Sequence, residues 1–267
     1  MVLGGCIDAP PGSPENVLRV EMNQWISDTG DGGLAAFLGK LGGRDVPSFE
    51  GPMSGGRLIQ QEELMKMTES FKQFPVMEKG ALLTAECQCG GVSFRIKRAN
   101  FTDPSDPTEE RYIPQDKTKY MAKGCVCRDC RHQHGTSLTL WWCVPYQSVI
   151  NPRKNQIIRH RGAAITPEGQ AANAGLGLTY YQSSANAYRA FCSTCGASAF
   201  YNFDDRPDIC VISAGLMRAE EGIMARRWVS WEWGSTSFPE EAVDKEICDA
   251  WMATADGKVY APTVKQR

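Results

Sequence analysis

The 267-residue sequence lacks features that define several large classes of proteins. No apolar run approaches the ~18–20 residues that a membrane-spanning helix needs. The sequence has 29 basic and 31 acidic residues and no run of basic residues. It therefore lacks the basic segment that typically binds nucleic acid or anionic lipid. Met1 to Gly12 have neither a basic start nor an apolar stretch of signal-peptide length. We therefore expect a soluble, cytoplasmic protein that binds neither membranes nor nucleic acid.

Cysteine is abundant, and its placement is the most informative feature of the chain. Seven of the 11 cysteines fall into three short clusters. The long chain, the odd number of cysteines and the missing secretion signal argue against a disulfide framework. Closely spaced Cys-x-Cys and Cys-x-x-Cys clusters instead favour metal, and zinc in particular. The clusters are Cys87-Gln88-Cys89, Cys125-Val126-Cys127-Arg128-Asp129-Cys130 and Cys192-Ser193-Thr194-Cys195.

The two cysteine pairs can close one four-thiolate site. Cys87 and Cys89 are two residues apart, so in an extended strand their side chains point to the same face. Cys192 and Cys195 have the form of a zinc knuckle, with Gly196 allowing a tight turn after the second cysteine. A shared ion would join the start of the strand-rich region to its end. A zinc site with four cysteine ligands is typically structural. In peptides, such a zinc ion has an apparent binding free energy of ~10–16 kcal/mol, so this site is expected to stabilise the fold.

The triplet Cys125, Cys127 and Cys130 supplies only three ligands. Three thiolates within six residues repel one another unless a cation holds them. A zinc ion held by three thiolates keeps a position for water or substrate, and its negative net charge suits it to holding an incoming thiolate rather than activating water. The triplet is therefore predicted to bind a second, catalytic zinc.

Neighbouring residues leave the role of the triplet open. His132 or His134 could add a fourth ligand and close the site, or one of them could move a proton beside an open zinc; we favour neither being a ligand. Arg128 and Arg131 could dock a substrate carboxylate or lie on the surface in contact with water. The isolated Cys143 and Cys210 lie in apolar segments and are expected to be buried.

Apolar patterning predicts a mainly β fold flanked by a few helices. Strands are expected at 92–96, 138–144, 200–203 and 209–212 because their residues alternate or are continuously apolar. Lys97 to Tyr120 and Asn151 to Leu178 are expected to be long loops, either a substrate wall or tolerated insertions. Amphipathic helices are predicted at Gln60–Phe74 and after a capping box at Ser237 to Glu240.

Together the clusters and their neighbours resemble the glutathione-dependent formaldehyde-activating enzyme family, which includes centromere-protein-V-like proteins. The resemblance covers about Leu83 to Gly215. It is carried by Cys87-Gln88-Cys89-Gly90-Gly91-Val92-Ser93-Phe94, by the triplet with Arg131 and Gly135, and by Arg189-Ala190-Phe191-Cys192-Ser193-Thr194-Cys195-Gly196. His134 departs from the pattern, since a small hydroxyl residue commonly precedes that glycine.

The resemblance implies a β-tent of small antiparallel sheets around two zinc ions. Cys87, Cys89, Cys192 and Cys195 would hold the structural zinc, and Cys125, Cys127 and Cys130 the catalytic one. It divides the chain into an N-terminal extension at 1–80, a zinc domain at 81–235 and a C-terminal helix and tail at 236–267. Within the extension, Trp25-Ile26-Ser27 is similar to Trp228-Val229-Ser230, which favours the remnant of a preceding copy or a chance similarity.

The function expected from the sequence is that of a zinc-dependent carbon–sulfur lyase, similar to S-hydroxymethylglutathione synthase. Its substrate would be a thiol or thioether, possibly glutathione or one of its adducts, bound through sulfur. The alternative is a non-catalytic zinc scaffold that binds a protein partner. A nucleic-acid-binding zinc module is disfavoured by the balanced charge. The sequence does not indicate the electrophile, the reaction direction or the oligomeric state.

Overall fold

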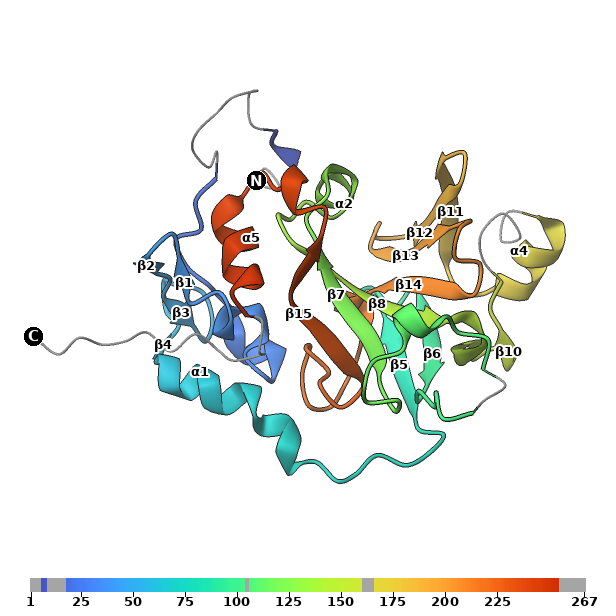
Figure 1. Cartoon of the computed structure of the whole chain (residues 1–267), viewed down its shortest axis with the longest axis horizontal. Coiled ribbons are helices and arrows are strands. Elements are labelled where there is room, and N and C mark those ends of the chain that lie inside the picture. The colour runs from blue at the N-terminus through green and yellow to red at the C-terminus, as the bar shows by residue number, and fades with distance from the viewer. Residues whose placement is uncertain (1–5, 9–17, 104–105, 160–165, 255–267) are drawn as a thin grey trace, which may run out of the picture.

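The computed structural model describes residues 6–8, 18–103, 106–159 and 166–254. Within these residues the chain is mainly β, with several antiparallel sheets and four α-helices, as Figure 1 shows. None of the helices there has the length and apolar character that crossing a bilayer requires. The prediction of a mainly β fold with a few helices is confirmed.

The largest sheet has seven strands and carries most of the candidate site. Its order is β11-β12-β13-β14-β8-β7-β15, and every neighbouring pair is antiparallel except β15 and β7, which are parallel. The strands span Leu178–Ser184 (β11), Ala187–Cys192 (β12), Ser198–Phe203 (β13), Ile209–Ser213 (β14), Thr139–Pro145 (β8), Tyr120–Cys125 (β7) and Val229–Ser237 (β15).

A four-stranded antiparallel sheet of order β10-β9-β6-β5 lies beside it. Phe94 of this sheet and Phe200 of the larger one are buried, with ring centroids 4.9 Å apart, so both sheets contribute to a common core. The four strands span Leu82–Glu86 (β5), Ser93–Lys97 (β6), Val149–Asn151 (β9) and Gln156–Ile157 (β10). The four strands predicted from apolar patterning are thereby found, in β6, β8, β13 and β14.

The N-terminal extension packs on this core rather than standing apart from it. Ile26, Phe37 and Leu64 are buried in the same apolar cluster as the residues of the two sheets. The buried Asp31 carboxylate accepts hydrogen bonds from the backbone N–H groups of Gly33 (3.0 Å) and Met224 (2.8 Å). The extension is therefore tied to the loop that precedes β15.

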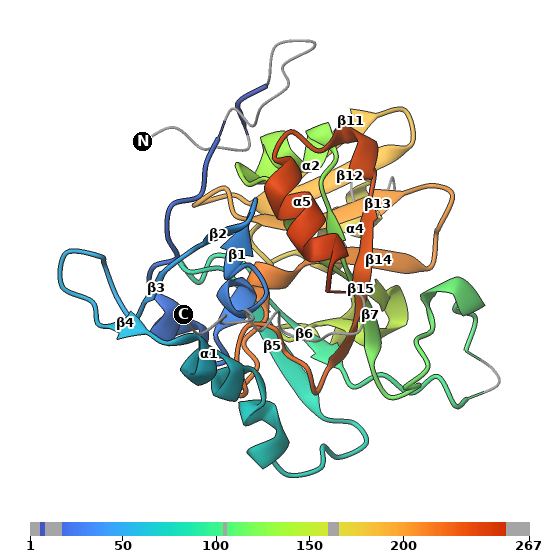
Figure 2. The same ribbon diagram turned by 60° about the vertical axis from the view of Figure 1, so that its left-hand side comes forward.

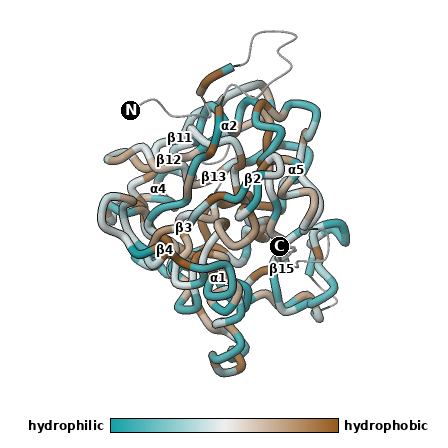
Figure 3. The backbone as a smooth tube through the Cα atoms, turned by 90° about the vertical axis from the view of Figure 1, so that its left-hand side faces the viewer, coloured by the Kyte–Doolittle hydropathy of each residue, from teal (hydrophilic) through white to brown (hydrophobic). Residues whose placement is uncertain are grey.

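The elements of the extension are short and gather on one face of the molecule (Figure 3). The segment similar to the start of β15 is not a strand, because Ile26–Thr29 forms a 3₁₀ turn after Trp25 in the left-handed region. The two segments thus differ in conformation. The two hairpins and the helix span Lys40–Leu41 (β1), Arg44–Asp45 (β2), Ser48–Phe49 (β3), Leu58–Ile59 (β4) and Gln61–Thr68 (α1).

The helices agree only in part with those predicted. The helix predicted over Gln60–Phe74 ends at Thr68, and a 3₁₀ turn, Ser70–Gln73, follows it. The predicted C-terminal capping box was wrong, since Ser237 still belongs to β15. The cap of α5 (Lys245–Met252) is instead Asp244, which accepts from the Ile247 N–H at 3.1 Å.

Helix α5 lies against β15, as Figure 2 shows, and closes that edge of the large sheet. The buried Trp251 donates its indole N–H to the carbonyl of Ser235 at 2.6 Å. Its ring packs against those of Trp231 and Trp233, with centroids 6.1 and 5.2 Å apart. The sequence segment from Asn151 to Leu178, expected to be a loop, contains β10 and a short helix, α4 (Pro167–Asn173), capped by Thr166.

Candidate metal centres

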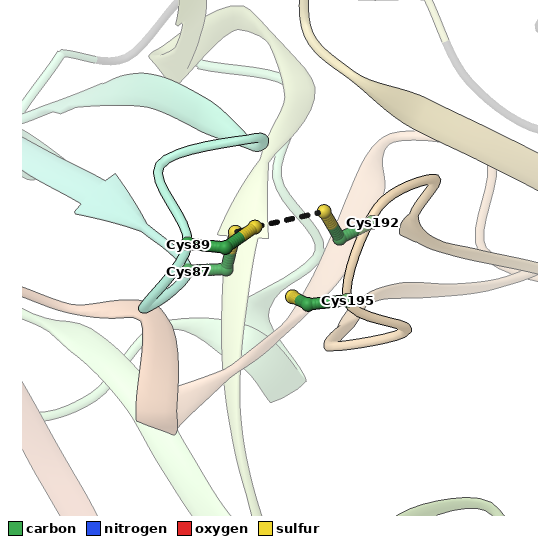
Figure 4. Close-up of side chains that lie close together, drawn as sticks. All are labelled: Cys87, Cys89, Cys192 and Cys195. Carbon is green, nitrogen blue, oxygen red and sulfur yellow. Dashed lines mark hydrogen bonds between the residues drawn. The ribbon is translucent and has the colours of Figure 1, made fainter.

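The fold brings the two cysteine pairs together. The sulfur atoms of Cys87, Cys89, Cys192 and Cys195 all lie within 4.8 Å of one another, and Figure 4 shows the four side chains converging from two chain segments. Cys89 Sγ lies 3.4 Å from Cys87 Sγ and 3.6 Å from Cys192 Sγ. Four soft ligands at this spacing fit a tetrahedral metal site. The predicted pairing is thus compatible with the structure.

One local expectation for this four-cysteine cluster was wrong. Cys87 and Cys89 do not share a strand face; they lie in the turn that joins β5 to β6. This turn directs the N–H groups of Gly91 and Val92 at the sulfurs of Cys89 and Cys87, both at 3.3 Å. Gly91 is required there, because a Cβ atom on it would lie 2.8 Å from Cys192 Sγ.

Backbone N–H groups favour the thiolate of Cys192 in this cluster, whereas at Cys89 the Gly91 N–H is outweighed by the Cys195 and Cys87 thiols, which raise its pKa to about 12. Burial acts to raise the pKa of the Cys192 thiol, but the N–H groups of Cys195 and Thr194 outweigh it and lower that pKa from 9.0 to about 6. Hydrogen bonds from N–H groups stabilise the charged form of sulfur. The sulfurs of this cluster therefore differ in their protonation, and a bound cation would stabilise them as thiolates.

The triplet forms a second group whose sulfur atoms also lie within 4.8 Å of one another. Cys125 ends β7, and Cys127 is the N-cap of helix α2 (Arg128–His134), accepting from the Cys130 N–H at 3.4 Å. The strand and the first turn of the helix thus aim all three sulfurs at one point. No histidine or carboxylate of the described residues joins this group.

The three thiols share protons unequally. Hydrogen bonds from the Cys125 and Cys130 thiols lower the pKa of Cys127 to about 2. The same contacts raise the pKa of Cys125 to about 11 and raise that of Cys130 as well. Crowded thiols behave in this way because one thiolate is stabilised by its neighbours while further charge is disfavoured. A bound cation would offset the repulsion that disfavours a second and a third thiolate.

The triplet opens into a large pocket. All three cysteines line a cavity of about 1020 Å³, together with six basic and four acidic side chains. The excess of cations favours anionic ligands beside the thiolates. The charged residues that line it are Arg111, Lys123, Arg128, Arg131, Arg189, Arg206, Asp129, Asp205, Glu232 and Glu241.

Two arginines of this wall pack on the same tyrosine. The guanidinium groups of Arg189 and Arg206 both lie over the Tyr201 ring, at 4.7 and 5.4 Å from its centroid. Arg189 is largely buried and donates to the Gln133 side chain of α2. The Nε atom of Arg206 is buried without a hydrogen-bond partner among the described residues, 3.9 Å from the Asp205 carboxylate. Arg206 is also hydrogen-bonded to Tyr112, and it lines the same cavity as the triplet.

The two histidines do not face the triplet pocket. His132 Nε2 lies 3.1 Å from the Asp8 carboxylate. His134 packs edge-on against Trp141 at 4.8 Å and lines a different pocket of about 670 Å³, shared with Cys87. Burial lowers the pKa of His134 to about 4, so its ring is neutral near pH 7. Among the described residues, no histidine joins the triplet to form a closed three-cysteine, one-histidine site.

The flanking arginines differ in their exposure. Arg131 is buried, with a 3% exposed side chain, whereas Arg128 is exposed, and both line the pocket. The segment from Lys97 to Tyr120 supplies the wall residues Arg111 and Tyr112, while no described residue of Asn151 to Leu178 lines that pocket. Cys143 and Cys210 are buried as expected, and Cys143 lies in the pocket wall.

Sequence reasoning missed four residues around the triplet. Arg189 belongs to the recognised cluster and could have been considered, but Asp8, Tyr201 and Arg206 stand in no motif. Tertiary contacts place them here. Strand β12 pairs Arg189 with Tyr201 of β13, and the N-terminal segment contacts α2. These are long-range contacts that leave no local signal.

Comparison with models of known protein families finds no match, and no curated protein matches the chain. Among solved structures, a crystal structure of a Rhodobacter sphaeroides protein from a structural-genomics programme is similar. It is 16% identical to this chain and covers 55% of this chain and 98% of its own, with a TM-score of 0.31. A similarity this remote supports no inference about function.

Proposed function

We propose that the chain is a zinc-dependent carbon–sulfur lyase-type enzyme that binds a thiol or thioether through sulfur at the triplet. The observation that carries this proposal is the contrast between the two clusters. Four sulfurs close one site, while three sulfurs line a pocket of about 1020 Å³. A site with three protein ligands and an adjoining cavity is typical of catalytic zinc, and a site with four is typical of structural zinc.

Zinc bound at Cys125, Cys127 and Cys130 would supply a Lewis acid that keeps an incoming thiol deprotonated near neutral pH. The protein residues bring the reactants together. In the direction of addition, the substrate sulfur forms a bond to a carbonyl carbon, and the thiol proton passes to the carbonyl oxygen. Cleavage reverses these events, with the sulfur as leaving group.

The pocket wall favours a substrate that carries an acidic group. Arg206 is held by the faces of Tyr201 and Phe203 and lines the same cavity as the triplet. A guanidinium fixed by aromatic rings loses little freedom on binding a carboxylate. Glutathione, a thiol with two carboxylates, has the chemistry that such a pocket suits.

This proposal includes the family suggested by the sequence. The mainly β fold with two cysteine groups agrees with a β-tent protein of the glutathione-dependent formaldehyde-activating family, and the resemblance around all three clusters supports it. The conformation of the N-terminal extension at 26–29 gives no support to a preceding copy of the domain.

Optical titration of the cobalt-substituted protein tests the proposal. Cobalt(II) has a sulfur-to-metal charge-transfer band whose intensity rises with each thiolate bound. Glutathione is expected to increase this band at lower concentration than 2-mercaptoethanol, which lacks a carboxylate. Arg206→Met should remove most of that difference, whereas Arg57→Met, which breaks an exposed ion pair with Glu50 outside the pocket, should retain it. A closed metal site, as in the alternative scaffold, would show no increase with either thiol.

A further inference from the structure

Cys6, Ile7 and Asp8 of the N-terminal extension contact helix α2, which contains Cys130 and has Cys127 as its N-cap. We propose that Asp8 is a positioning residue of this metal centre: it fixes helix α2 so that Cys127 and Cys130 keep the spacing that a metal requires. The inference needs a metal at the triplet but not the carbon–sulfur chemistry proposed above. It assigns a function to an extension that lies outside the cysteine clusters.

Asp8 contacts three side chains of α2, two of which are arginines. Its carboxylate accepts from Arg131 Nη2 at 2.9 Å, lies 3.1 Å from His132 Nε2 and lies 3.5 Å from Arg128 Nη2. The first of these bonds contributes most to lowering the pKa of Asp8 to about 2, so the carboxylate is ionised at all ordinary pH values. Next to it, the carbonyl of Ile7 accepts from Arg131 Nη1 at 3.2 Å.

Helix α2 depends on contacts of this kind. It has seven residues, and isolated helices shorter than about 12–15 residues are marginal in water. Its first turn nevertheless has to hold Cys127 and Cys130 against Cys125 on another element. Arg131 is the buried residue beside Cys130, and a buried guanidinium is costly unless it is paired and hydrogen-bonded. Asp8 supplies that pairing from 123 residues away.

The opposite side of α2 is fixed independently. Gln133 donates to the hydroxyl of Ser198 in β13 at 2.6 Å and accepts from Arg189 in β12. These bonds attach the end of the helix to the large sheet. Asp8 therefore adds a contact at the middle of the helix, next to Cys130, which also lies in an apolar cluster with Trp141 and Cys143 of β8. Groups that orient metal ligands in this way typically change metal affinity 10- to 100-fold when removed.

The test compares zinc affinity at the two clusters in one chain. Competition with a chromophoric chelator resolves two binding steps, and the four-cysteine cluster serves as the internal control. Asp8→Asn is expected to lower affinity at the triplet 10- to 100-fold and leave the four-cysteine step within about twofold. Asp8→Glu should restore most of the loss. Glu21→Gln, which breaks an exposed pair with Arg19, should change neither step.

Alkylation of the zinc-loaded protein, followed by peptide mass mapping, provides a second readout. Asp8→Asn should speed modification of Cys127 at least tenfold while Cys89 and Cys195 stay protected. Triplet affinity within twofold of the unmodified chain, or an equal loss at both clusters, would overturn the role of Asp8. If the wild-type chain binds metal only at the four-cysteine cluster, both this inference and the proposed function are refuted. If the wild-type chain binds two metals and Asp8→Asn does not change their affinity, this inference alone is refuted.

Discussion

Single residues make the two cysteine clusters chemically different. Three sulfurs of the four-cysteine cluster, those of Cys87, Cys89 and Cys192, accept hydrogen bonds from backbone N–H groups of two turns. The triplet has a pocket with arginines on its open side. This difference underlies our proposal of a structural role for the first cluster and a substrate-binding role for the second.

Replacement of one triplet cysteine should separate these roles. Cys127→Ser is expected to reduce bound zinc from two ions per chain to one and to abolish turnover, because two remaining thiolates hold zinc weakly. The melting temperature should change little, since the four-cysteine cluster is intact. Elemental analysis and calorimetry give both readouts. Cys248→Ala, which lies outside both clusters, is the control; loss of both metals from Cys127→Ser would contradict the assignment.

The triplet should bind metal in a pH-dependent manner. Cys127 is a thiolate at pH 7, while the pKa of Cys125, about 11, and the raised pKa of Cys130 keep those two thiols protonated. Ligands must be deprotonated, so metal binding should release about two protons and affinity should fall as the pH falls. Calorimetry in buffers of different ionisation enthalpy measures this number. Release of no protons would show that the free triplet is already ionised.

At the level of elements, turns matter more to the site than strands do. Gly91 lies in the turn between β5 and β6, and a Cβ atom there would lie 2.8 Å from Cys192 Sγ and 3.1 Å from Cys89 Sγ. Gly91→Ala should displace a sulfur and cost roughly 1–3 kcal/mol in the free energy of unfolding, as overpacking does. Gly215→Ala is the control, because nothing lies within 4 Å of its added Cβ. Equal stability of the two variants in denaturant titration would count against this role of Gly91.

How far the sequence predicts this structure depends on the range of the contacts involved. The strands β6, β8, β13 and β14 follow from local apolar patterning, and the cysteine groups follow from spacing. The cap of α5 was missed because Ser237 pairs with Cys125 in the sheet, which overrides its local capping signal. Asp8 and Arg206 could not be predicted, since only tertiary contacts between distant segments bring them to the triplet.

Across the whole molecule, the four-cysteine cluster joins the turn after β5 to the turn after β12. It therefore links the two sheets across 103 residues of sequence. Structural zinc contributes an apparent ~10–16 kcal/mol in peptides, which is comparable to the total stability of a domain. Removal of both metals by a strong chelator should thus unfold the chain or lower its melting temperature steeply, as circular dichroism would show. An apo chain as stable as the metal-loaded one would exclude a structural metal here.

The central claim is that one cluster is a closed metal site and the other an open one. X-ray absorption at the zinc edge, on protein with measured metal content and then with added glutathione, tests it most directly. We predict two zinc ions per chain, with a mean of fewer than four sulfur ligands that rises when the thiol is added, because the triplet gains a sulfur. One zinc per chain, or a nitrogen ligand and no change with glutathione, would contradict the claim.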